Sequence, residues 1–247
     1  MSKWVRRFHQ APEGEALLVC FPHAGGSAGA YLSLSAVLKD RVQTLAVQYP
    51  GRQDRIAETC AGDVDEIVDA VLQALEPYRE DRRRIGLFGH SMGALPAFEA
   101  ARRMEREGWQ PAALFVSARQ APSLPWPPVG APRLYDADER RVLDELELLG
   151  GSARELLADP EVMGFVLPAL RADYRLLYKY EYRPDARLAC SVVALAGASD
   201  PRVPVEGVRA WEEETCGPFA CHVLPGGHFY LEGELARVAA VIEAALV

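Results

Sequence analysis

Short runs of apolar and β-branched residues alternate along the chain with longer stretches in which apolar residues recur every three or four positions. The short runs are typical of buried strands, and the longer stretches are typical of helices with one apolar face. The predicted strands are 17–21, 44–49, 84–88, 113–117, 191–196 and 219–224. This alternation predicts an α/β fold in which helices flank a mostly parallel central sheet.

The stretch 63–76 shows the helical pattern clearly, because its apolar residues fall at i, i+3 and i+4 spacings. These residues are Val64, Ile67, Val68, Val71, Leu72 and Leu75. The stretches 94–107 and 234–246 follow the same pattern. We therefore predict three helices that each turn one face to the core.

The segment 118–185 interrupts the alternation of strands and helices. Five prolines surround Trp126 between positions 122 and 132, a density that excludes a regular helix or a central strand. Helical patterns follow at 136–149 and 161–180, with Gly150-Gly151 as a possible hinge between them. We interpret residues 1–247 as one domain that carries 118–185 as a mostly helical insertion.

The chain has 247 residues and a formal net charge of −8, from 27 basic and 35 acidic side chains. Nucleic-acid binding requires a broad basic surface, so this balance argues against a nucleic-acid partner. No apolar run is long enough for a signal peptide or a membrane span. A cytoplasmic protein without a membrane partner is expected.

The predicted strand 84–88 leads directly into Gly89-His90-Ser91-Met92-Gly93 and then into the helical stretch 94–107. This is the G-x-S-x-G nucleophile elbow in its expected context of strand, turn and helix. The flanking glycines allow a sharp turn that exposes the Ser91 hydroxyl at the carboxyl edge of the sheet. Ser91 is therefore the candidate nucleophile of a hydrolase.

A serine hydroxyl needs a base within hydrogen-bond distance and a carboxylate that orients the base. In α/β-hydrolases the acid and then the histidine follow the serine in the chain. His228 lies in a loop just after the last predicted strand, whereas His222 lies near the middle of that strand. Asp200 follows strand 191–196, and it can also be read as a turn residue. We predict His228 as the base and Asp200 as the acid.

Attack on an acyl carbonyl also requires N–H donors for the developing oxyanion. The backbone N–H of Met92, next to the nucleophile, is one candidate. The loop Phe21-Pro22-His23-Ala24-Gly25-Gly26, which follows an early strand, offers the N–H of Ala24 as the second. No Lys-Ser/Thr pair follows this loop, so it is not a Walker phosphate-binding loop.

Several segments in collinear order together resemble the type II thioesterases, the discrete α/β-hydrolases that accompany polyketide synthases and nonribosomal peptide synthetases. They are Phe21-Pro22-His23-Ala24-Gly25-Gly26, Tyr49-Pro50-Gly51-Arg52 with Arg55, Gly89-His90-Ser91-Met92-Gly93-Ala94 with Phe98-Glu99, Ser117-Ala118-Arg119, Gly197-Ala198-Ser199-Asp200 and Gly226-Gly227-His228-Phe229.

The resemblance implies hydrolysis of acyl groups from the phosphopantetheine arm of acyl or peptidyl carrier proteins, which clears stalled or wrongly primed units. It assigns the roles already predicted for Ser91, Asp200, His228, Ala24 and Met92. The insertion 118–185 corresponds to a helical lid over the acyl pocket. A monomer is expected, and no metal or cofactor is implied.

Two binding roles are expected in addition. Trp126 is a candidate for lining the acyl pocket. Carrier proteins are usually acidic, so a chain of charge −8 needs a local basic patch to attract them. Residues 1–60 hold 7 basic and 5 acidic side chains, which makes Arg52 and Arg55 candidate docking residues. The alternative is that both arginines pair internally.

Three other functions share parts of this pattern. An esterase or lipase that acts on small-molecule esters would use the same triad. An acyltransferase would pass the acyl group from the serine to an alcohol or amine instead of water. A non-catalytic hydrolase scaffold ranks last, because such scaffolds usually lack part of the triad.

Overall fold

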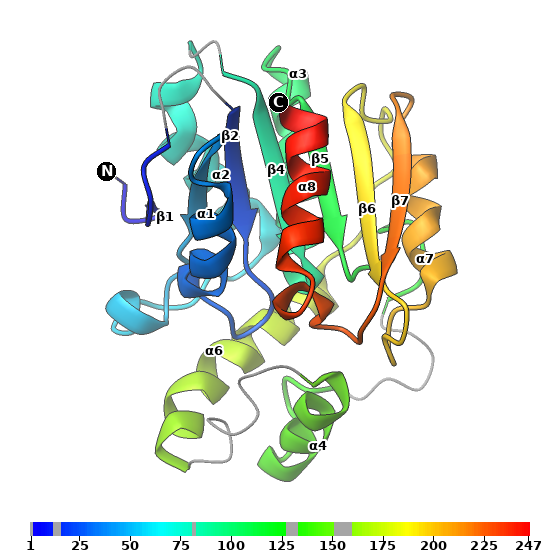
Figure 1. Ribbon diagram of the computed structural model, residues 1–247. Helices are drawn as coiled ribbons and strands as arrows, with labels where there is room; N and C mark the ends of the chain where they lie inside the picture. Colours follow the sequence, from blue (N-terminus) through cyan, green and yellow to red (C-terminus); the bar gives the residue numbers. More distant parts are fainter. Residues whose placement is uncertain (1, 12–15, 81–82, 127–132, 151–159) are drawn as a thin grey trace.

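The centre of the molecule is a seven-stranded sheet with the strand order β1-β3-β2-β4-β5-β6-β7 (Figure 1). The computed structural model describes residues 2–11, 16–80, 83–126, 133–150 and 160–247. The strands are β1 (Val5–Arg6), β2 (Ala16–Phe21), β3 (Val42–Val47), β4 (Ile85–His90), β5 (Ala113–Ser117), β6 (Ser191–Gly197) and β7 (Phe219–Leu224). β1 is antiparallel to β3, and the other neighbouring pairs are parallel. The predicted mostly parallel sheet is confirmed.

Strands β2, β3, β4 and β5 have every residue buried. They show continuous apolar runs because helices cover both faces of a parallel sheet. The edge strand β7 buries only its last residue, Leu224. All six predicted strands are present. The sequence did not reveal β1, because two residues are too few to show a periodic pattern.

Helices lie on both faces of the sheet (Figure 1). They are α1 (Leu32–Leu38), α2 (Val64–Leu75), α3 (Ala94–Arg106), α4 (Glu139–Leu149), α6 (Pro160–Lys179), α7 (Val205–Arg209) and α8 (Leu235–Leu246). α1 and α8 pack on one face and α2 and α3 on the other, each pair over its own apolar cluster. The predicted helices 63–76, 94–107 and 234–246 correspond to α2, α3 and α8.

The apolar face predicted for α2 is buried, with Leu72 at its margin. The helix begins where predicted because the Asp63 side chain accepts a hydrogen bond from the Glu66 N–H at 2.8 Å. Burial of one such apolar side chain stabilises the fold by about 1.5–3 kcal/mol. The face of α2, and not its helix propensity alone, therefore fixes its position on the sheet.

Helices α4 and α6 belong to the segment between β5 and β6, and they match the patterns predicted at 136–149 and 161–180. Figure 1 shows both below the carboxyl ends of the strands. Gly150 ends α4 with a φ of 75°. The proposed hinge includes Gly151, and Pro127, Pro128 and Pro132 belong to the proline-dense segment. These four residues lie outside the described residues.

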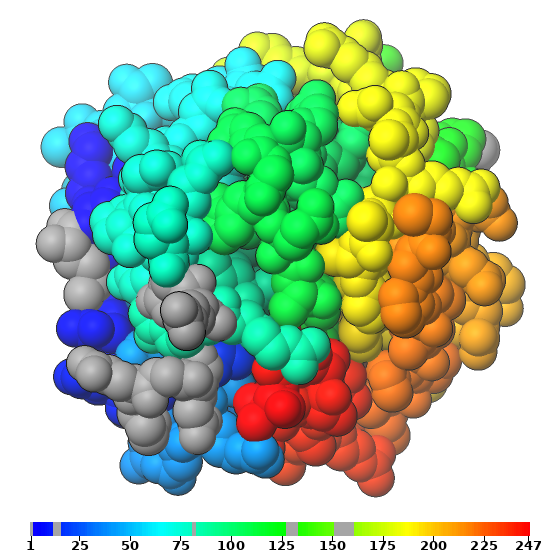
Figure 2. Space-filling view, turned by 90° about the horizontal axis from the view of Figure 1, so that it is seen from above, coloured from blue at the N-terminus to red at the C-terminus, as the bar shows by residue number. Residues whose placement is uncertain are grey.

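The opposite end of the sheet is seen in Figure 2, where the C-terminal segment lies between the N-terminal part of the chain and β7. Arg41, three residues after the end of α1, forms an ion pair with Glu243 of α8 at 3.4 Å. Within the described ranges, no helix combines the length and apolar character that a membrane span requires.

Candidate active site

Ser91 lies in the sharp turn between β4 and α3, with a positive φ of 54°. Such backbone geometry is uncommon outside glycine, and it lifts the hydroxyl out of the turn. A Cβ at position 89 would lie 2.3 Å from the carbonyl oxygen of Gly93. A Cβ at position 93 would lie 2.0 Å from the carbonyl oxygen of Phe21. Both glycines of the elbow are therefore required by close backbone contacts.

Ser91, His228 and Asp200 meet at the carboxyl ends of three strands. His228 Nε2 lies 2.9 Å from Ser91 Oγ, and His228 Nδ1 lies 2.7 Å from Asp200 Oδ2. An ionised carboxylate only accepts hydrogen bonds, so Nδ1 carries the proton and Nε2 is free to accept the hydroxyl proton. The structure thus brings the three residues predicted from the sequence into one hydrogen-bonded chain.

Asp200 is fixed from two directions. Its side chain is 1% exposed, and Oδ1 accepts hydrogen bonds from the N–H groups of Arg202 at 2.9 Å and Val203 at 3.1 Å. The loop of Asp200 packs directly on the loop of His228, since a Cβ at Gly197 would lie 2.1 Å from the Gly227 carbonyl oxygen. Oδ2 is thereby left to orient the imidazole.

The loop that carries Ala24 is held by a buried ion pair between Arg52 and Asp173. The two side chains form two bonds, Nη1–Oδ2 at 2.6 Å and Nη2–Oδ1 at 2.8 Å. Asp173 Oδ2 also accepts the Gly25 N–H at 2.7 Å, and Arg52 Nη1 donates to the Gly26 carbonyl at 3.1 Å. Ala24 itself lines a cavity together with Ser91 and His228.

Arg52 and Arg55 do not form an exposed docking patch, so this expectation from the sequence is wrong. They are 5% and 4% exposed. Arg52 is paired with Asp173, whereas Arg55 binds Glu58 through two bonds of 2.9 and 2.7 Å. The alternative of internal pairing is correct: Glu58 is a near neighbour of Arg55, whereas Asp173 is 121 residues away from Arg52. Guanidinium groups that are buried and paired are not available to an incoming carrier protein.

The cavity beside Ser91, here called the serine cavity, is narrow, with a volume of about 40 Å³. Its lining includes Ala24, Ser91, Arg119, Trp126, Glu145, Tyr174, Tyr178, Arg202 and His228. Trp126 thus lies on the wall of this cavity, next to residues that the sequence did not single out as lining.

Two of the missed residues left a signal in the sequence. Asp173 is a charged residue within the apolar face of α6, three positions from the buried Leu170 and Leu176. A carboxylate at such a position needs a buried partner. Arg119 belongs to a motif shared with the thioesterases, yet the motif gave it no role. Its position follows from β5, which ends two residues earlier.

A buried polar chain lies behind the triad. His90 Nδ1 is 2.8 Å from Ser117 Oγ, which is 2.6 Å from the Tyr230 hydroxyl. Burial, then the charges of His228 and His23, hold the pKa of His90 well below its usual value, while the backbone of His228 opposes that shift. His90 therefore stays neutral beside His228.

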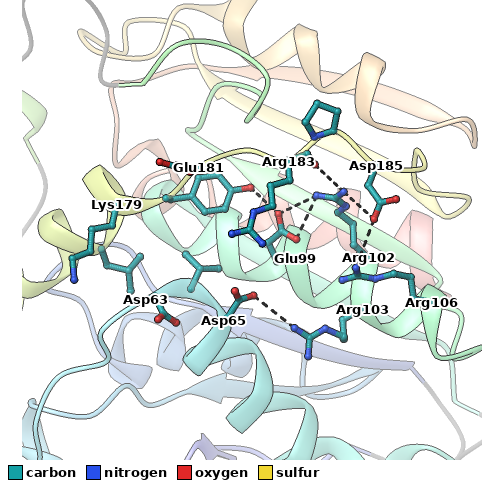
Figure 3. Close-up of a pocket in the computed structure, with 14 residues that line it drawn as sticks. Asp63, Asp65, Glu99, Arg102, Arg103, Arg106, Lys179, Glu181, Arg183 and Asp185 are labelled. Carbon is teal, nitrogen blue, oxygen red and sulfur yellow. Dashed lines mark hydrogen bonds and ion pairs between the residues drawn. The ribbon is translucent and has the colours of Figure 1, made fainter.

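A second and larger cavity, of about 440 Å³, lies between α2, α3 and the end of α6 (Figure 3). Several of its charged side chains pair with each other. Arg102 binds Glu99 at 3.2 Å and Asp185 at 3.2 Å, and Arg103 binds Asp65 at 3.6 Å. None of Ser91, Asp200 and His228 lines it. In the described part of the chain, no group of three His, Cys, Asp or Glu residues could hold a metal ion.

Residues 16–246 match the family model of the thioesterase domain. Thioesterase PikA5 of Streptomyces venezuelae is 46% identical over 94% of this chain and 81% of its own length. A probable cadicidin biosynthesis thioesterase of Streptomyces griseus is 41% identical over 99% of this chain, which spans only 66% of that relative.

Solved structures agree with the family match. The type II thioesterase BorB from the borrelidin biosynthetic cluster superposes with a TM-score of 0.90 at 41% identity, covering 99% of this chain and 98% of BorB. The RedJ thioesterase from the prodiginine pathway of Streptomyces coelicolor superposes with a TM-score of 0.85 at 34% identity. The match covers 96% of this chain and 89% of RedJ. The predicted α/β-hydrolase fold is confirmed, and this chain belongs to the thioesterase family.

Proposed function

We propose that this protein hydrolyses acyl groups from the phosphopantetheine arm of acyl or peptidyl carrier proteins, removing stalled or aberrant units during polyketide or nonribosomal peptide synthesis. The single observation that carries the chemistry is the hydrogen-bonded chain Ser91–His228–Asp200. The family supports the thioester bond as target. The carrier-bound substrate is supported by two relatives, one named a probable cadicidin biosynthesis thioesterase and one a type II thioesterase from the borrelidin biosynthetic cluster.

In the proposed mechanism, Ser91 Oγ attacks the thioester carbonyl while His228 Nε2 accepts the hydroxyl proton. The imidazolium is stabilised by Asp200, and the N–H groups of Ala24 and Met92 bind the oxyanion. Collapse of the tetrahedral intermediate breaks the C–S bond, and the thiol leaves with the proton from His228. Water, deprotonated by His228, then attacks the acyl-serine ester and releases the acid and Ser91.

The helical segment 118–185 acts in this proposal as a lid over the acyl pocket. Support comes from α6, whose Asp173 bonds to the loop of Ala24, and from the lining of the serine cavity by residues of both α4 and α6. We further infer a cytoplasmic monomer, as expected for a dissociable partner of carrier proteins.

A hydrolysis panel tests this function. Carrier proteins loaded with acetyl, propionyl, malonyl, longer acyl and aminoacyl groups are each incubated with the enzyme and with Ser91→Ala. We expect the free acid and the free thiol arm as products, and loss of turnover in Ser91→Ala with unchanged circular dichroism. A strong preference for a soluble ester of the same chain would favour an esterase. Transfer of the acyl group to an alcohol or amine would favour an acyltransferase.

A further inference from the structure

Among the described residues, the Arg119 guanidinium has no hydrogen-bond acceptor and no ion-pair partner. The residue is 3% exposed, and its Nε is buried without a hydrogen bond. Among the described residues no carboxylate lies within ion-pair distance of it. Arg202 on the same cavity wall behaves differently, because its Nε binds Glu145 Oε1 at 2.6 Å. One of the two arginines at the serine cavity is therefore satisfied internally and the other is not.

The Arg119 guanidinium lies over the ring of Trp126, with Cζ 3.7 Å from the ring centroid. The Trp126 Nε1 atom is also buried without a hydrogen bond. The aromatic face offsets part of the positive charge, but it accepts no conventional hydrogen bond from either N–H. Arg119 and Trp126, each with one unpaired buried donor, thus both belong to the wall that also includes Ser91 and His228.

Buried donors without acceptors are unfavourable, and most buried polar groups in proteins are paired. Burial lowers the pKa of Arg119 to about 9, and the neighbouring Tyr180 and Tyr174 oppose this shift. The group stays protonated near neutral pH, so it can only donate. What this wall lacks is an acceptor, and the substrate is the molecule that enters here.

The charge around the serine cavity decides which acceptor fits. Arg119 and Arg202 are balanced by Glu145 and by Asp200, which binds His228 beside the cavity. The formal sum is zero, so the wall needs an oxygen and does not need a further negative charge. The cavity is narrow, at about 40 Å³, so a short chain is the acyl group considered.

We propose that Arg119, together with the Trp126 N–H, binds a neutral oxo or hydroxyl oxygen on a short acyl chain and so selects oxygenated acyl groups over saturated ones of equal length. This inference rests on the proposed thioesterase function, whose acyl group it specifies. A hydrogen bond from a charged donor typically changes binding by about 10- to 100-fold.

The test compares N-acetylcysteamine thioesters of butyryl, 3-hydroxybutyryl, 3-oxobutyryl and malonyl groups. We expect the kcat/KM ratio of 3-oxobutyryl to butyryl to fall at least about 10-fold in Arg119→Met, mostly through KM. Differences in the intrinsic reactivity of the thioesters cancel when this ratio is compared between enzyme variants. Trp126→Phe keeps the ring and removes the N–H, so it should lower the ratio by a smaller factor.

Arg102→Met is the matched control, since Arg102 is also buried and lies over an aromatic ring, that of Phe98 at 5.3 Å, but outside the serine cavity. It should leave the ratio unchanged. If Arg119→Met does not fold, the result is decided by Arg119→Lys and Trp126→Phe. Arg119→Lys keeps the positive charge but loses the planar guanidinium. Thermal melting checks the fold of each variant.

The proposal is overturned if the ratio is the same in the unaltered enzyme and in folded Arg119 variants, or if malonyl is preferred over 3-oxobutyryl. Absence of hydrolysis for every thioester would instead contradict the proposed function. In that case calorimetric binding of the butyryl and 3-oxobutyryl thioesters to Ser91→Ala still decides the preference, with tighter binding of the oxygenated compound expected.

Discussion

Arg52 and Asp173 are 121 residues apart in the sequence and form a bidentate ion pair in which each side chain is 6% exposed. The pair joins α6 to the loop after β2, because Asp173 also accepts the Gly25 N–H and Arg52 binds the Gly26 carbonyl. The position of the Ala24 N–H, one residue before Gly25, therefore depends on a contact with the inserted segment.

Asp173→Asn should lower the free energy of unfolding by about 3–5 kcal/mol, because it leaves the Arg52 charge buried without a counter-ion. Below its melting temperature the variant should also lose kcat, since the loop of the proposed oxyanion donor loses its charged acceptor. Urea denaturation and thioester hydrolysis measure the two effects. Glu213→Gln is the control, because Glu213 (70% exposed) forms an exposed pair with Arg187 (56% exposed). This change should alter stability by less than about 0.5 kcal/mol. A stability of Asp173→Asn equal to that control would refute the role of the pair.

The helices and strands that the sequence predicted all show a local pattern of apolar residues. Six strands and the helices α2, α3 and α8 follow from runs and spacings within about fifteen residues. The chain Ser91–His228–Asp200 could also be predicted, because parallel strands bring their carboxyl ends to one edge of the sheet. Ordered loops after three such strands must then lie near one another.

The errors have two sources. Arg52 looked available because its partner, Asp173, lies 121 residues away in the sequence. Arg55 pairs with its near neighbour Glu58 and with the carbonyl of Gln48, and a count of charges over residues 1–60 does not show which of them pair. The motif that contains Arg119 did not indicate its role, for a related reason. Its isolation from acceptors is a property of the folded cavity and not of neighbouring residues in the sequence.

Asp200→Asn should reduce kcat/KM by up to about 10,000-fold, because an amide at this position favours the wrong imidazole tautomer of His228. Stability should change little if the N–H contacts of Arg202 and Val203 to the side-chain oxygen are kept. Steady-state hydrolysis of a carrier-bound acyl group measures the loss. Asp69→Asn, an exposed carboxylate that binds Arg103, is the matched control and should retain activity. Near-normal turnover in Asp200→Asn would mean that another acid orients the base.

Removal of the two hydroxyl groups behind the triad should have unequal effects. Ser117→Ala removes the partner that His90 Nδ1 and the Tyr230 hydroxyl share, so both groups lose a contact. Tyr230→Phe removes only the contact between Tyr230 and Ser117, and the Ser117–His90 contact remains. An unsatisfied buried group costs about 1–3 kcal/mol. Ser117→Ala should therefore destabilise the fold more than Tyr230→Phe, as urea denaturation at neutral pH would show. The reverse order would indicate that Tyr230 makes the dominant contact.

The stability of the fold should rise with pH between about 4 and 6.5 through a contribution of His23. Burial, followed by the charges of His228 and Arg52, lowers its pKa from 6.5 to about 4. In this window the unfolded chain binds a proton at position 23 that the folded chain does not, so the free energy of unfolding increases with pH, by at most about 1.4 kcal/mol per unit. The contribution is complete above pH 6.5 and is lost as the pH falls toward 4.

Urea denaturation at pH 4.5, 5.5, 6.5 and 7.5 measures this effect. The free energy of unfolding should rise less steeply with pH for His23→Gln than for the unaltered protein. Identical slopes for the two proteins would show that His23 is protonated equally in both states.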